Sequence, residues 1–227
     1  MFKLSVLPVL ALLTGHTQIL TKMDLFKGSE NVGHGTYEEK FERNGHKTSV
    51  FDLITTDDRT MKVYLKQTKV IDNKAFPLWE HEVVLTVITG PHPARIEDDM
   101  MLRFDDTGAA LLTHKLTINK EKQPTTERSY LPPPGYSRAD PSDLWFSKVT
   151  PLPGTTVTST VFDIEQPRWF IVETTFVGKK WITVGGRQIQ ANEVKDIRDG
   201  SVRRVYLDDK GQPVLMKHED MRTEKHF

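Results

Sequence analysis

Two short segments of the chain match a known catalytic pattern. Residues 106–109 read Asp-Thr-Gly-Ala, the sequence around the catalytic aspartate of aspartic proteases. Those enzymes pair two such aspartates, so that one carboxyl is protonated while the other is ionised. A second copy at residues 209–211 reads Asp-Lys-Gly and lacks the hydroxyl residue after the aspartate. Both segments also fit a tight turn between two strands, which explains them without catalysis.

Eight histidines raise the question of metal binding or acid–base catalysis. No two of them form a His-x-x-x-His pair, and the chain contains no cysteine, so the sequence predicts no metal site. His81 and His218 stand beside carboxylates, but neighbours on a strand point to opposite faces. We therefore predict no cofactor and no catalytic residue, and retain His81 and His218 as acid–base candidates in case the protein is an enzyme.

The charge balance narrows the class of partner. The 227 residues include 31 Lys and Arg against 31 Asp and Glu, so the formal net charge is zero. Nucleic-acid binding needs an excess of basic residues on at least one face. This balanced composition does not indicate such an excess, so no nucleic-acid partner is predicted. A chain of this length can bury a core without disulfides or a structural metal.

The first residues have the three-part layout of a secretory signal peptide. A lysine at position 3 precedes the apolar run 4–13, and residues 14–18 are polar. The apolar run spans about 15 Å as a helix, half of what a bilayer core requires, so no transmembrane span is expected. We predict that residues 1–18 are a signal peptide and that the protein is periplasmic or secreted. The alternative is a buried N-terminal strand or helix of a cytosolic protein.

Strand patterns dominate the remaining sequence. Met61, Val63 and Leu65 alternate with Lys and Tyr, the period of two expected of a half-buried antiparallel strand. Segments 102–114 and 205–217 align as strand, Asp-Asp-x-Gly turn and strand, which suits a meander. A helical turn or two is expected only at residues 19–27. Turns are predicted at residues 44–45, 178–179, 185–186 and 199–200.

These patterns predict an all-β, mainly antiparallel fold. We expect an open or half-closed β-barrel of about eleven strands, with a short N-terminal helix and a proline-rich covering segment. Residues 19–227 are predicted to form one domain. Within it, the proline-rich residues 123–152 are expected to be a loop or a crossover over an open end.

Aromatic residues suggest what the concave face of such a sheet could bind. A large twisted sheet curls, and a sparsely covered concave face leaves an apolar cavity. Candidate ligand-binding residues are Trp145, Phe146, Trp169 and Trp181. Phe170 is a further candidate, but it is adjacent to Trp169 on one strand, so at most one of the two faces inward. The alternative is that the same side chains fill the barrel.

Several turn-and-strand patterns resemble a family of exported bacterial proteins of unknown function. They are Pro-Gly at residues 153–154, Val-Gly at 177–178, a Gly-Gly…Ala step at 185–191, Tyr-Leu-x-x-x-Gly-x-Pro at 206–213, and Asn-Val-Gly-His-Gly at 31–35. The resemblance covers most of residues 28–222. It implies the open, half-closed β-barrel of periplasmic lipoprotein carriers and their receptors. The family pattern defines no catalytic or binding residue, and the proline-rich segment is not matched to it.

The sequence therefore predicts an exported protein that binds a lipid or other apolar molecule in the concave face of a half-barrel. A first alternative is a non-catalytic module of the bacterial envelope with a filled barrel. Such a module would bind a protein partner through an edge strand or the proline-rich segment. A second alternative is an enzyme that uses the cavity as its active site.

Overall fold

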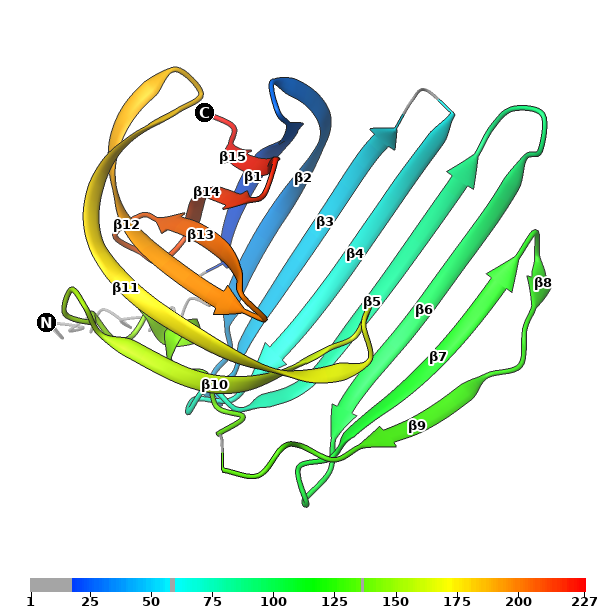
Figure 1. Cartoon of the computed structure of the whole chain (residues 1–227), viewed down its shortest axis with the longest axis horizontal. Coiled ribbons are helices and arrows are strands. Elements are labelled where there is room, and N and C mark those ends of the chain that lie inside the picture. The colour runs from blue at the N-terminus through cyan, green and yellow to red at the C-terminus, as the bar shows by residue number, and fades with distance from the viewer. Residues whose placement is uncertain (1–17, 58–59, 136) are drawn as a thin grey trace, which may run out of the picture.

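The computed structural model describes residues 18–57, 60–135 and 137–227, and it folds them into one curled 15-stranded sheet (Figure 1). All pairs of named strands are antiparallel, which confirms the predicted class. The strands are β1 (Gln18–Lys27), β2 (Glu30–Phe41), β3 (Lys47–Asp57), β4 (Met61–Ile71), β5 (Pro77–Ile88), β6 (Ala94–Phe104), β7 (Ala110–Ile118), β8 (Glu121–Lys122), β9 (Thr126–Tyr130), β10 (Thr156–Asp163), β11 (Arg168–Val184), β12 (Arg187–Arg198), β13 (Ser201–Leu207), β14 (Pro213–His218) and β15 (Met221–Lys225).

Two details of the predicted fold are wrong. The described residues form fifteen strands, not eleven, because β8, β9 and β15 are short and largely polar and give no clear apolar alternation. The predicted N-terminal helix is instead strand β1, paired with β2 and with the C-terminal strand β15. Its buried side chains Thr21, Met23 and Leu25 show the alternation of a strand. The predicted signal peptide, residues 1–18, lies outside the described residues except for Gln18.

Most of the predicted turns join neighbouring strands. Gly45 (φ +85°) closes the β2–β3 hairpin, and Asp199 and Gly200 (φ +48° and +78°) close the β12–β13 hairpin. The turn predicted at residues 178–179 is wrong, because Gly178 lies inside β11. There the pairing with β12 shifts between Phe176 and Gly178, so the glycine serves a β-bulge.

The Asp-Asp-x-Gly repeat forms two equivalent turns. Asp105 accepts hydrogen bonds from the backbone N–H groups of Thr107 and Ala109, between β6 and β7. Asp208 makes the same bonds at the β13–β14 turn. In each copy the first aspartate orders the turn, and Asp106 and Asp209 are exposed. The segment that matches aspartic proteases is therefore a turn.

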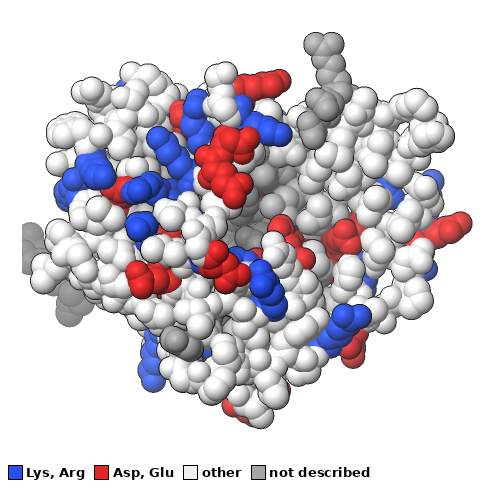
Figure 2. Space-filling model, in the orientation of Figure 1, with Lys and Arg blue, Asp and Glu red and all other residues white. Residues whose placement is uncertain are grey.

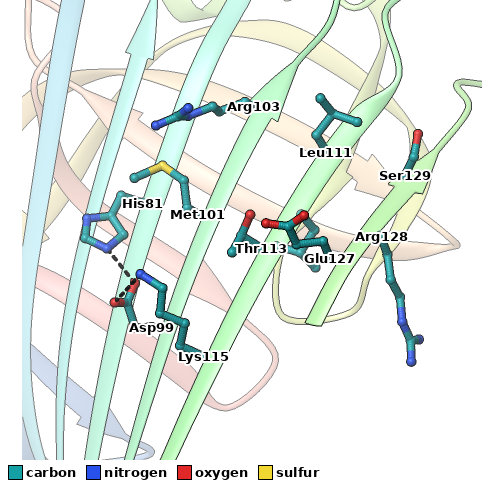
Figure 3. A pocket seen from close by; sticks show the side chains of 11 residues that line it. His81, Asp99, Met101, Arg103, Leu111, Thr113, Lys115, Glu127, Arg128 and Ser129 are labelled. Atoms are coloured by element: carbon teal, nitrogen blue, oxygen red, sulfur yellow. Dashed lines mark hydrogen bonds and ion pairs between the residues drawn. The ribbon is translucent and has the colours of Figure 1, made fainter. Parts of the chain in front are cut away.

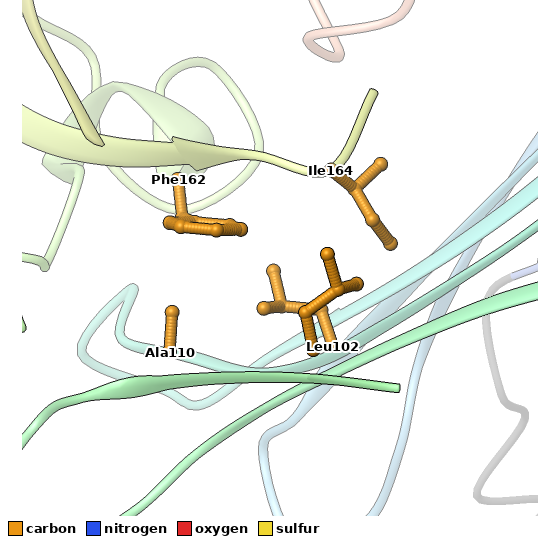
Figure 4. Packing of buried hydrophobic residues seen from close by; sticks show 5 residues of the cluster. Leu102, Ala110, Phe162 and Ile164 are labelled. Carbon is orange, nitrogen blue, oxygen red and sulfur yellow. The ribbon is translucent and has the colours of Figure 1, made fainter. Parts of the chain in front are cut away.

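The sheet curls so that its two ends face each other. Strands β2 to β8 form one broad wall, and β10 to β14 curl in front of it to form the second (Figure 1). Where the walls meet, Leu102 and Ala110 of the first pack against Phe162 and Ile164 from β10 and the turn after it (Figure 4). We call the face of β2–β7 that carries Leu102 the inner face, and the opposite face the outer face.

The proline-rich segment crosses from one end of the sheet to the other. It includes β9, which pairs with β7, and the 3-10 helix η1 (Pro141–Leu144), and it leads into β10. Leu144 of η1 packs with Ile71 and Ala75 of the first wall. The next residue, Trp145, packs with Phe176 and Val194 of the second. This end of the half-barrel is therefore filled by the crossover.

Candidate functional site

The inner face of the first wall changes character along its strands. Residues two apart on a strand share a face, and the register aligns them into cross-strand rows. The rows next to the crossover are polar on β4 and β5, whereas the rows beyond are largely aliphatic. Read across β3, β4, β5 and β6 in turn, the two rows nearest the crossover are Ser49–Lys69–Glu80–Leu102 and Phe51–Gln67–Glu82–Met100. The two rows beyond them are Leu53–Leu65–Val84–Asp98 and Thr55–Val63–Thr86–Ile96.

A buried carboxylate, Glu39 of β2, anchors the polar end of this face. The Lys47 ammonium lies 2.6 Å from Glu39 Oε1, and the Tyr37 hydroxyl donates to the same oxygen at 2.5 Å. Gln212, from the β13–β14 turn, donates to Glu39 Oε2 at 2.6 Å. Burial and the neighbouring Glu39 charge raise the pKa of Tyr37 well above its usual value. Both oxygens of Glu39 are therefore paired, and the side chain ties both walls together.

The crossover is fastened to this network through Asp143. Lys69 Nζ lies 2.8 Å from Asp143 Oδ2, and Lys47 Nζ donates to the main-chain oxygen of Asp143 at 2.8 Å. Burial opposes both charges, but the ion pair outweighs it, so the pKa of Lys69 lies above and that of Asp143 below its usual value. Asp140 caps η1 and accepts a hydrogen bond from Ser159 of β10.

Two further carboxylates lie on β5, Glu80 in the row of Lys69 and Glu82 in the next row out. Gln67 Nε2 donates to Glu80 Oε1 and to Glu82 Oε2, each at 2.9 Å. Glu82 is only 1% exposed, and its Oε1 has no hydrogen-bond partner. Burial raises the pKa of Glu82 to about 7, and the like charges of Glu165 and Glu80 add to the effect. Burial raises the pKa of Glu80 as well.

A cavity of about 150 Å³ reaches Gln67, the donor to Glu80 and Glu82, although neither carboxylate is part of its lining. In the space-filling view the surface is hollowed near its centre, with Asp and Glu side chains beside the hollow (Figure 2). Phe51 and Gln67 place the cavity next to the aliphatic rows, because Leu53 and Leu65 lie two residues further along the same strands. The cavity is lined by Tyr37, Lys47, Ser49, Phe51, Gln67, Lys69, Ile71 and Asp143.

The four aromatic residues proposed from the sequence do not share one site. Trp145 and Phe146 pack together near Phe176, where Trp145 is 4% exposed. Trp169 belongs to the separate cluster around Leu102, and its indole N–H donates to a main-chain oxygen of β9. Trp181 is 70% exposed on β11.

Phe170, the further candidate, is buried, with the guanidinium groups of Arg168 and Arg198 near its ring. Sequence reasoning missed the polar inner-face residues, although the period of two already placed Gln67 and Lys69 on the face of Leu65.

A larger groove of about 650 Å³ lies on the outer face (Figure 3). There His81 Nε2 lies 2.9 Å from Asp99 Oδ1, and Lys115 is 3.8 Å from the other oxygen of the same carboxylate. Within the described residues His81 makes no hydrogen bond to a hydroxyl. The second candidate, His218, lies 2.8 Å from the Ser201 hydroxyl, on β13 and β14. These are two separate pairs, and neither forms a catalytic triad.

The described part of the chain contains neither a metal-binding cluster nor a membrane-spanning helix. No group of three or more His, Asp or Glu side chains there is arranged to hold a metal ion. Nor does that part contain a helix long and apolar enough to cross a membrane.

The comparisons with known proteins support the fold. No family model matches the chain, and a search of curated proteins finds no match. A solved structure, a β-barrel-like protein of a domain of unknown function (DUF1849) from Brucella abortus, matches with a TM-score of 0.53 at 14% sequence identity. The match covers 92% of this chain and 94% of that chain. The chain thus has the fold of a bacterial β-barrel-like protein, and at this identity no residue role is carried over.

Proposed function

We propose that the protein binds an amphipathic molecule on the inner face of its half-barrel. The apolar part would lie on the aliphatic rows, and the polar part would reach the cavity beside Gln67. The observation that carries this proposal is the change from aliphatic to polar rows along the same strands. Met61, Val63 and Leu65 are half-buried, and none of them belongs to a buried core cluster in the described residues.

The aliphatic rows supply enough binding energy for such a ligand. Burying ten methylene groups contributes on the order of 8 kcal/mol before the costs of ordering and association. A lipid or another molecule with one alkyl chain satisfies this condition.

Ligand binding is tested by native mass spectrometry of protein purified from its own host, and by titration with the neutral fluorescent probe N-phenyl-1-naphthylamine. We expect a co-purified lipid or saturable probe binding. If the chain carries no lipid and the probe does not bind, the proposal is wrong. A filled-barrel module that recognises a protein partner is then favoured, and its contact surface would include the exposed Leu131 and Leu152 of the crossover (76% and 77% exposed).

We also propose that the protein is exported and works in the periplasm or outside the cell. The support is the signal-peptide layout of residues 1–18. N-terminal sequencing of the protein from its own host tests this. A chain that begins near residue 19 agrees with export, whereas an intact Met1 on the purified protein contradicts it.

A further inference from the structure

We propose that the polar part of the ligand is a protonated amine, held between the carboxylates of Glu80 and Glu82. This inference rests on the proposed function and names the head-group chemistry of that site. It follows from the charge inventory of the inner face, from an unpartnered buried oxygen and from the position of the Gln67 amide.

The inner face carries more negative than positive groups. In the network described above, two lysines accompany five carboxyl groups. Each lysine already forms an ion pair, Lys47 with Glu39 and Lys69 with Asp143. Asp140 is satisfied by hydrogen bonds from η1 and β10. The two carboxylates left without an ion-pair partner within 4 Å are those of Glu80 and Glu82.

One oxygen atom of these two carboxylates also lacks a hydrogen-bond donor. Glu82 is 1% exposed, and its Oε1 has no partner in the described structure. Buried polar atoms almost always have a partner, because leaving one unpaired costs the full desolvation free energy. Glu82 Oε1 therefore marks a place where a donor would bind.

The Gln67 amide shows where a donor can reach both carboxylates. Its nitrogen lies 2.9 Å from Glu80 Oε1 and 2.9 Å from Glu82 Oε2. Gln67 also lines the 150 Å³ cavity, so a head group entering there meets this amide first. An ammonium group has three donors against the two of an amide, and it adds the missing positive charge. The ammonium group can take the place of the Gln67 amide between the two carboxylates and can also donate to Glu82 Oε1.

The rows beyond the carboxylates fit the rest of such a ligand. Val84 follows Glu82 by two residues, and Leu65 precedes Gln67 by two, so both lie on the same face one row further out. A primary amine with an unbranched alkyl chain thus matches the order of the side chains. A carboxylate or phosphate head would instead face the unpaired charges of Glu80 and Glu82.

Ionisation of Glu82 should make the affinity depend on pH. Its carboxyl ionises near pH 7, whereas a primary amine stays protonated to about pH 10. Affinity for the amine is therefore expected to rise from pH 6 to pH 8. Two further charged pairs lie nearby, Asp98 with His114 and Asp163 with Arg198. From the first wall, the groups that face Glu82 are Gln67 and Lys69 of β4, Glu80 of β5, Asp98 of β6 and His114 of β7. From the second wall they are Asp163 of β10, Glu165 of the turn after it and Arg198 of β12.

The experiment compares three ligands that have different head groups on alkyl chains of the same length. Dodecylamine, dodecan-1-ol and dodecanoate, each below its micelle concentration, are titrated against bound N-phenyl-1-naphthylamine at pH 6 and pH 8. At pH 8 we expect the amine to bind about tenfold or more tightly than the alcohol, the size of a charge-assisted hydrogen bond. In Glu82→Gln this preference should disappear while the alcohol still binds. Glu97→Gln, which removes a carboxylate from the outer face of β6, is the matched control and should keep it.

The outcomes separate this inference from the proposed function. If all three molecules bind equally, or dodecanoate binds best, the amine inference is overturned and the proposed function stands. If none displaces the probe and the probe itself does not bind, the proposed function fails with it. Should Glu82→Gln fold poorly, Gln67→Lys serves instead. Its tethered ammonium should occupy the place between the carboxylates and abolish the preference for dodecylamine.

Discussion

Two buried glutamates on the inner face differ in the charge of their partners. Glu39 and Glu82 are each 1% exposed. Glu39 lies 2.6 Å from the Lys47 ammonium, whereas Glu82 receives only the neutral Gln67 amide. Because a buried charge without a counter-charge is costly, Glu82 holds its proton to a higher pH. The same face of the sheet thus holds a lysine-paired carboxylate at one position and a carboxylate with a raised pKa at the other.

This difference predicts a pH-dependent effect of Glu82→Gln on stability. Below pH 4.5 the carboxyl is protonated in both states, but between pH 4.5 and about 7 only the unfolded chain ionises it, so stability falls as pH rises. Above pH 7 the full penalty, on the order of 3 kcal/mol, is present. Glu82→Gln removes it. We expect urea denaturation at pH 8 to show a more stable variant, with the difference shrinking towards pH 5. A stability change of equal size at both pH values contradicts this, and Glu97→Gln is the control.

At the scale of elements, Asp143 and Leu144 fasten the part of the crossover that lies between β9 and β10. The described residues between β9 and β10 contain no strand, and η1 is only four residues long. Asp143→Ala removes the ion pair with Lys69, which is about one-third exposed and is therefore worth about 1 kcal/mol. We expect faster trypsin cleavage after Arg138 and Lys148, measured by mass spectrometry of the fragments.

The matched control for this prediction is Asp199→Ala. It removes the exposed ion pair with Arg168, at the β12–β13 turn. Unchanged cleavage in Asp143→Ala would show that Leu144 and Trp145 hold the segment without help from the ion pair.

The sequence predicted those elements whose structure depends on neighbouring residues. Alternation in residues 60–71 and the turns at residues 44–45 and 199–200 are local patterns, and each lies where it was expected. Strand β1 is wrongly predicted as a helix although it pairs with its neighbour β2 along its whole length. Its second partner, β15, lies about two hundred residues away, and no local pattern reports it. The candidate site depends on such distant contacts as well. Asp143 meets Lys69, and Gln212 meets Glu39, only after the sheet has curled.

For the whole molecule, the half-barrel divides into a covered part and an open part. In the covered part, Leu102 is 1% exposed and packs against the second wall (Figure 4). In the open part, Leu65 is half-buried and belongs to no buried cluster in the described structure. Stability should therefore depend mainly on the first part and ligand binding on the second.

Two substitutions in the same sheet separate these roles. Leu102→Ala leaves a cavity between the walls and should cost about 2–5 kcal/mol in urea denaturation, with little change in the affinity for N-phenyl-1-naphthylamine. Leu65→Asn removes apolar surface from an uncovered row. It should therefore weaken the binding of the probe by about tenfold and cost less stability than Leu102→Ala. The reverse pattern, with probe binding lost in Leu102→Ala alone, would place the apolar site between the walls. The aliphatic rows would then be only the surface of an open sheet.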